Sequence, residues 1–192
     1  MEKYLILMAG LPGTGKTNAA KKISKYLEGY VFLSQNELRR DDGMKRMPKT
    51  FDHILRKIDM ESRKLLDNDK GVVVDSVNRY LFRRHQLYGV ASCCGKKVIT
   101  IECICSEKEA KKRMEKRPGS DGLLSDPNDP KIWDKLANSW EDIQKDFQYP
   151  GEEHVSYIQF DTEKMSINHK VVQTGTKRFI NQIEKILLDK IE

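Results

Sequence analysis

Residues 10–17 read Gly10-Leu11-Pro12-Gly13-Thr14-Gly15-Lys16-Thr17, which satisfies the pattern G-x-x-x-x-G-K-[ST] at every fixed position. An apolar run over residues 4–9 precedes this stretch and is typical of a strand buried on both faces. Apolar residues then recur at helical spacing after the stretch, at Ala19, Ala20, Ile23 and Leu27. The order strand, glycine loop, helix is the context in which backbone N–H groups and a helix N-terminus bind phosphate.

This motif assigns roles to its last two residues. Lys16 is placed to reach the β- and γ-phosphates of a nucleoside triphosphate, and the Thr17 hydroxyl to hold Mg²⁺. A second carboxylate for Mg²⁺ is expected at the end of a neighbouring strand, and Asp75 ends the β-branched run Gly71-Val72-Val73-Val74-Asp75. The sequence therefore predicts triphosphate binding by residues 10–17, with Thr17 and Asp75 as metal ligands.

The rest of the chain alternates between strand and helix patterns. Strands are predicted at 30–34, 71–75, 97–105 and 154–160, the last being the final strand. Helices are predicted around 51–65 and at 78–94, 107–117, 132–147 and 176–191. This alternation predicts the α/β class, with a parallel sheet covered by helices on both faces. The polar stretch 118–130 is long for a connection, so it is expected to form part of a lid spanning about 113–130.

Length and composition limit the alternatives. A chain of 192 residues predicts one domain, 1–192, and its Lys and Arg exceed Asp and Glu by 35 to 29, a net charge of +6. No apolar stretch approaches the length of a membrane span, and the N-terminal residues lack the pattern of a secretory signal. The four cysteines are too few and too clustered for a disulfide scaffold. We therefore expect a cytoplasmic protein with reduced thiols and no membrane association.

The residues around the motif also narrow the reaction. Ser76 follows Asp75, where a dedicated hydrolase usually carries a glutamate that activates water. No Asn-Lys-x-Asp segment, which GTPases use to recognise the base, is present in the sequence. Transfer of the γ-phosphoryl group to an acceptor other than water remains, which is the reaction of a kinase.

Three motifs together resemble the phage-type polynucleotide kinases, which form a wider group with zeta toxins and related small-molecule kinases. These are the loop at 10–17, Arg39 after the second predicted strand, and Val74-Asp75-Ser76-Val77-Asn78 with Arg83-Arg84 after it. The resemblance implies a P-loop NTPase fold with a kinase-type lid, ATP and Mg²⁺ as cofactors, and the 5′-hydroxyl of a nucleic acid as acceptor. It places Arg39 against the acceptor, with Asn36 and Asn78 on the same side. It also implies that Arg113 or Arg117 neutralises charge on the transferred group from the lid.

One position departs from this pattern, because Asn36 stands where such kinases carry the aspartate that accepts the proton of the acceptor hydroxyl. Glu37 could supply the base instead, or Asp41, Asp42 or Asp52 could reach the site. Alternatively, the amide only orients the acceptor, or no transfer takes place. A loose transition state requires little of a base, so Asn36 does not exclude a kinase. A small-molecule or nucleotide kinase, and an ATP-binding regulatory module with weakened catalysis, therefore remain alternatives.

The basic residues between Arg39 and Lys64 have two interpretations. They could form an acceptor-side wall for a polyanion such as RNA or DNA, or the solvated face of a helix. Phe51 is the only aromatic residue in this stretch, which argues against sequence-specific recognition of bases. The oligomeric state is not predicted by any feature of the sequence.

Overall fold

The computed structural model describes residues 2–41, 48–116, 130–148 and 154–189. Its strands are β1 (Leu5–Ala9), β2 (Tyr30–Ser34), β3 (Gly71–Asp75), β4 (Val98–Ile104), β5 (Val155–Asp161) and β6 (Ser166–Val171). Its α-helices are α1 (Lys16–Tyr26), α2 (Gln35–Asp41), α3 (Pro48–Asp67), α4 (Leu81–Cys93), α5 (Glu107–Glu115), α6 (Pro130–Ala137) and α7 (Lys177–Leu187). A 3₁₀ helix, η1, covers Ile143–Gln148.

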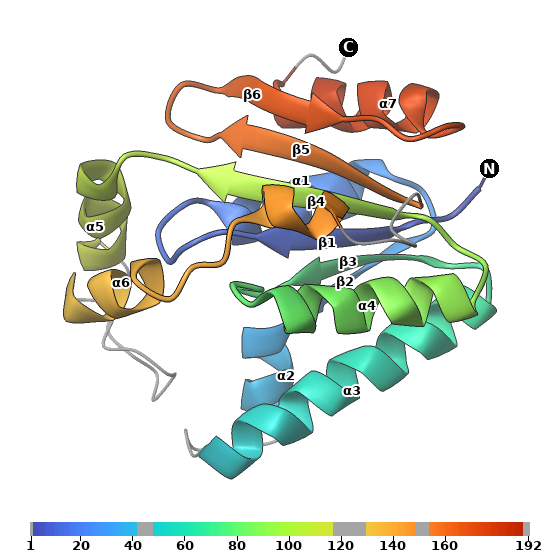
Figure 1. Ribbon diagram of the computed structural model, residues 1–192, viewed down its shortest axis with the longest axis horizontal. Coiled ribbons are helices and arrows are strands. Elements are labelled where there is room, and N and C mark those ends of the chain that lie inside the picture. Colours follow the sequence, from blue (N-terminus) through green and yellow to red (C-terminus); the bar gives the residue numbers. More distant parts are fainter. Residues whose placement is uncertain (1, 42–47, 117–129, 149–153, 190–192) are drawn as a thin grey trace.

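The strands form one sheet in the order β2-β3-β1-β4-β5-β6 (Figure 1). The first five strands in this order are parallel, and β6 pairs with β5 in the antiparallel sense. Helices α1 and α7 pack on one face of the sheet, while α3 and α4 pack on the other. The predicted α/β class, with a mostly parallel sheet covered on both faces, is therefore confirmed.

Strand β1 lies in the middle of the sheet and is fully buried, as its uninterrupted apolar sequence predicts. Its register pairs Met8 with Asp75 on β3 and Ala9 with Glu102 on β4. The carboxyl ends of these parallel strands therefore meet at one edge of the sheet, where loops of open α/β folds bind ligands. The turn before α1 and the start of α4 lie at this edge, together with α5 and α6 (Figure 1).

Four elements differ from the sequence-based expectation. Strand β6 was not predicted, because it is a partly exposed edge strand with a mixed polar sequence, so the expectation that 154–160 is the final strand was wrong. Helix α2 has only seven residues, too few to show a helical repeat. The helix predicted at 132–147 is divided into α6 and η1 by a segment whose residue Glu141 bonds to the backbone oxygen of Arg79. Helix α4 begins at Leu81 rather than Asn78, because Asn78 has a left-handed φ of 48°.

Among the described residues, no helix combines the length and the apolar character needed to cross a membrane.

Candidate active site

The glycine loop takes a backbone shape that side chains would prevent. Gly13 and Gly15 have φ values of 82° and 84°, in the left-handed region that favours glycine. A Cβ atom on Gly13 would lie 2.3 Å from the carbonyl oxygen of Ala110 on α5. The loop therefore packs directly against the backbone of α5, and Gly15 stands at the N-cap position of α1. This arrangement leads the loop into the positive end of the α1 dipole.

The two predicted metal ligands are in contact in the structure. The Thr17 hydroxyl donates a hydrogen bond of 2.7 Å to Oδ2 of Asp75, which is 4% exposed at the end of β3. A hydroxyl and a carboxylate oxygen are hard ligands of the kind that Mg²⁺ prefers. These side chains therefore fit the metal that the motif implies. Lys16 is nearly buried beside them, and its Nζ donates to the carbonyl oxygen of Leu11 at 2.8 Å.

The first residues of α2 follow β2 at the same edge of the sheet. Gln35 is buried and accepts a hydrogen bond from Ser76, the residue after Asp75, which ties the ends of β2 and β3 together. The sequence did not single out this pair. Arg39 of α2 is 1% exposed, so its side chain is enclosed within the protein. Its predicted contact with the acceptor stays a prediction.

The candidate proton acceptors lie at different places. Asn36 is exposed at the start of α2. Glu37 is partly exposed and forms an ion pair of 3.3 Å with Lys21 of α1. Asp41 and Asp52 are exposed, and Asp42 lies outside the described residues. The structure therefore leaves Glu37 as the candidate with a defined cationic neighbour.

Asn78 lies beneath the glycine loop. Its side chain is buried, and its Nδ2 donates to the carbonyl oxygen of Met8 at 2.7 Å, while the backbone N–H of Gly10 donates to Val77 at 3.2 Å. These bonds hold the segment after β3 against the end of β1. They account for an asparagine here without an acceptor, so its predicted acceptor-side role stays a prediction.

A buried ion pair fixes the same segment from the other side. Arg84 of α4 and Asp146 of η1 are both fully buried and share two hydrogen bonds of 2.6 Å. Arg84 also donates to the carbonyl oxygens of Asn78 and Arg79, and Tyr88 donates to Asp146 at 2.9 Å. Burial alone would lower the pKa of Arg84, but the hydrogen bonds and charge of Asp146 outweigh it and the pKa is raised. The sequence showed Arg84 within a motif but offered no signal for Asp146.

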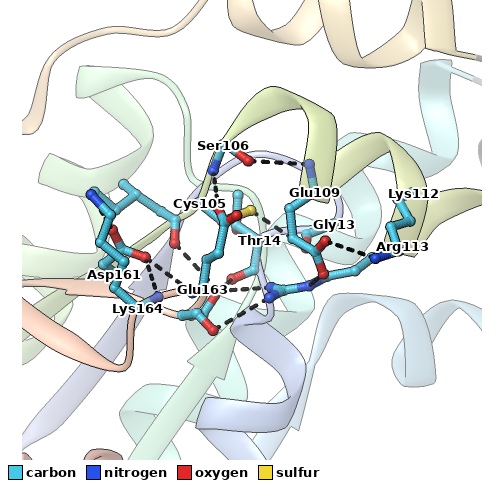
Figure 2. Close-up of polar contacts among 12 residues, drawn as sticks. Gly13, Thr14, Cys105, Ser106, Glu109, Lys112, Arg113, Asp161, Glu163 and Lys164 are labelled. Atoms are coloured by element: carbon cyan, nitrogen blue, oxygen red, sulfur yellow. Dashed lines mark hydrogen bonds and ion pairs between the residues drawn. The ribbon is translucent and has the colours of Figure 1, made fainter.

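The lid prediction falls only partly on described residues. Arg117 and residues 117–129 lie outside them. Arg113 lies in α5, where its Nε donates to Glu109 at 2.8 Å (Figure 2). Its Nη1 donates to the hydroxyl of Thr162 at 2.8 Å. Thr162 follows β5 and was missed by sequence reasoning, because a single threonine after a strand carries no motif.

Fold and site together define a class: a mostly parallel sheet with a glycine loop and a Thr17–Asp75 pair at its carboxyl edge is a P-loop kinase-like protein. A family model described as chromatin associated protein KTI12 matches residues 4–183. The chain therefore belongs to the KTI12 family. No curated protein sequence matches the chain.

Solved structures share the fold at low sequence identity. Kti12 of Chaetomium thermophilum in complex with ADP-AlF3 has a TM-score of 0.62 at 20% identity, covering 97% of this chain and 96% of that one. A gluconokinase from Sinorhizobium meliloti has a TM-score of 0.53 at 17% identity, covering 97% and 93%. A chain of the Pnkp1/Rnl/Hen1 RNA repair complex has a TM-score of 0.63 at 17% identity, covering 77% of this chain. This chain spans 39% and 46% of the chains it matches in two structures of that complex.

Proposed function

We propose that the protein binds ATP with Mg²⁺ at the glycine loop and transfers the γ-phosphoryl group to a hydroxyl. The observation that carries this proposal is the Thr17–Asp75 contact of 2.7 Å, made by the residue that follows Lys16 at the end of the glycine loop. A single domain of residues 1–192, a lid around 113–130 and a cytoplasmic location belong to the same proposal.

Each residue of the loop has a defined task in this reaction. The backbone N–H groups between Gly13 and Lys16 and the start of α1 bind the phosphate oxygens. Lys16 releases Leu11 and reaches the β- and γ-phosphates. Thr17 and Asp75 would hold Mg²⁺, which supplies neutralisation of charge on the phosphates. Transfer then depends on positioning and electrostatics, because a loose transition state needs little covalent help from the protein.

The leading acceptor is the 5′-hydroxyl of a nucleic acid. A chain of an RNA repair complex shares the fold of this protein, which agrees with this choice. A specific surface favours it as well: Phe82 is 60% exposed at the start of α4 and stacks on Tyr80 at 5.6 Å, and Arg79 covers the Tyr80 ring at 4.3 Å. Stacked aromatic rings with a cation are a common platform for unpaired bases. Both rings lie after β3 and therefore outside the basic stretch from Arg39 to Lys64, in which Phe51 was the only aromatic residue found from the sequence.

The test uses purified protein, ATP with Mg²⁺ and a single-stranded oligonucleotide that carries a 5′-hydroxyl. The proposal expects a 5′-phosphorylated oligonucleotide, and an oligonucleotide already phosphorylated at its 5′ end serves as the control. Labelling of a small sugar or nucleoside in place of the oligonucleotide would keep the kinase and reject the nucleic acid. ATP binding without transfer to any hydroxyl would reject the kinase.

Replacing Phe82 with alanine tests the acceptor separately from the chemistry. We expect the oligonucleotide to bind about fivefold or more weakly, since stacking of one base contributes about 1–3 kcal/mol. Affinity is measured by fluorescence anisotropy without ATP. Tyr26→Ala is the matched control, because Tyr26 is also an exposed aromatic residue but ends α1 at the opposite edge of the sheet. Equal binding by the Phe82 variant and the unmodified protein would contradict a stacking role.

A second candidate function is an ATP-binding module whose nucleotide state governs a partner. Two observations favour it: an amide, Asn36, stands at the position of the expected base, and the neighbouring Glu37 is paired with Lys21. Such a module binds ATP at the same loop but has no proton acceptor beside the γ-phosphate.

Glu37→Gln tests the base within the kinase proposal. If Glu37 accepts the proton of the acceptor hydroxyl, its loss is expected to lower kcat for transfer about 10²-fold while ATP affinity is kept. Turnover is measured with saturating ATP and acceptor, and Glu61→Gln on α3 provides a carboxylate replaced at a site without an assigned role. Unchanged transfer by the Glu37 variant would exclude Glu37 as the base.

A further inference from the structure

Residues from two parts of the chain enclose the glycine loop. The thiol of Cys105 lies 3.9 Å from the carbonyl oxygen of Gly13 and donates to it, and burial raises the pKa of this thiol, so it stays protonated. The backbone N–H of Ser106 donates to Glu163 at 2.9 Å, which joins the start of α5 to the turn after β5. Figure 2 shows these residues gathered around Gly13 and Thr14. The loop is therefore held between α5 and the β5–β6 turn.

Thr162 forms the central contact of this arrangement. Its hydroxyl donates to the carbonyl oxygen of Thr14 at 2.9 Å and accepts from Nη1 of Arg113 at 2.8 Å. Its side chain also lies 3.3 Å from the place where a Cβ on Gly15 would stand. One hydroxyl thus connects α5 to the loop and packs against its last glycine.

Arg113 is directed toward this hydroxyl by two further bonds. Its Nε donates to Glu109 one turn earlier in α5, and its Nη2 donates to the backbone oxygen of Thr162 at 3.3 Å. The bond from Arg113 lowers the pKa of Glu109, so the pair is ionised at neutral pH. The guanidinium is thereby engaged with the turn after β5.

The bond to Thr14 determines how the next peptide group faces. A trans peptide carries its C=O and N–H on opposite sides, and the described backbone has no cis peptide bonds. Fixing the Thr14 oxygen on Thr162 therefore turns the N–H of Gly15 away from Thr162. An N–H group of this loop that is already oriented binds phosphate without the entropic cost of ordering it on binding.

We propose that Thr162 and Arg113 are positioning residues of the nucleotide site, which hold the Thr14–Gly15 peptide in its phosphate-binding orientation. This inference rests on the nucleotide binding of the proposed function, but it does not depend on the acceptor. It assigns Arg113 a different role from the one implied by the resemblance, in which the arginine neutralises charge on the transferred phosphoryl group. The two roles change different kinetic constants.

The first experiment measures affinity for a fluorescent ATP analogue with Mg²⁺ by equilibrium titration. Thr162→Val removes the hydroxyl, and we expect about 3- to 30-fold weaker binding. Thr162→Ser keeps the hydroxyl and should restore the affinity. Thr176→Val is the matched control, because Thr176 is a buried threonine that bonds to Ser156 and Gln173 at the other edge of the sheet.

The second experiment adds Arg113→Met and the double variant. If both residues act through one hydrogen-bond chain, the double variant should bind the ATP analogue no more weakly than whichever single variant has the lower affinity. With an acceptor substrate and saturating ATP, kcat of the Arg113 variant should fall less than about tenfold, whereas a charge-neutralising arginine would cost about 10³-fold or more. Normal affinity of Thr162→Val, additive losses, or a large loss of kcat alone would each overturn the inference. An unmodified protein that binds no nucleotide would overturn the proposed function as well.

Discussion

Replacing Lys16 with alanine is expected to lower kcat/KM for phosphoryl transfer by about 10²–10³-fold, the typical cost of removing one donor aimed at developing charge. Lys16 is the first residue of α1, and its ammonium donates to the carbonyl oxygen of Leu11 within the glycine loop. Lys16 is the only basic residue at positions 10–17, so no other side chain of the loop can supply this charge. The Lys16 variant should also bind the ATP analogue more weakly.

Lys25→Ala is the control for this experiment. It removes the same charge from the same helix, but Lys25 is exposed in the last turn of α1. Both variants are measured with the same acceptor, and their urea unfolding is compared with that of the unmodified protein. A Lys16 variant with full activity would reject the glycine loop as the site of transfer. Loss of activity with an unfolded protein would be recognised from the unfolding curve.

The largest effect on stability is expected from Asp146→Ala, which should lower the free energy of unfolding by about 3–5 kcal/mol. The replacement leaves the guanidinium of Arg84 fully buried without its counter-charge, and Tyr88 loses one of its two hydroxyl partners. Burying a charge without a partner is costly, because the charge loses its hydration. In the intact pair, the attraction and the two short hydrogen bonds between Arg84 and Asp146 offset this cost. The same replacement also loosens the segment after Asp75, since Arg84 holds the carbonyl oxygens of Asn78 and Arg79.

The measurement is a urea titration at pH 7 followed by circular dichroism, with the slope of the transition compared between proteins. Asp69→Asn serves as the control, because Asp69 forms an ion pair with Lys96 at the surface. The urea midpoint of this variant should equal that of the unmodified protein. Replacing Arg84 and Asp146 together by methionine and leucine should recover part of the loss, as no buried charge remains. A midpoint of Asp146→Ala equal to that of the unmodified protein would show that water reaches Arg84.

The sequence predicted those parts of the site that depend on local order along the chain. The spacing from Gly10 to Thr17 requires a strand before it and a helix after it, and both are present. Asp75 could be placed beside Thr17, because a carboxylate at the end of a parallel strand faces the same edge of the sheet as the loop. The general class of the fold followed from the alternation of strands and helices.

Contacts between distant segments could not be predicted in the same way. Thr162 and Asp146 carry no motif, and their partners are chosen by the packing of β5, η1 and α5 rather than by spacing. Helix α2 is shorter than two helical turns, and β6 is partly exposed, so neither leaves a clear periodic pattern. The resemblance placed Arg113 by its distance along the chain, whereas the direction of its guanidinium depends on the β5–β6 turn.

The hydrogen bond between Thr162 and Thr14 joins residues 148 positions apart, and this separation affects how the site forms during synthesis. During synthesis the glycine loop emerges first, and Thr162 is added 148 residues after Thr14. Contacts with such long sequence separation form late, because the intervening chain must close a long loop. A nascent chain that ends before β5 lacks Thr162, so with the positioning role proposed for this residue such a chain should bind nucleotide more weakly than one that includes it.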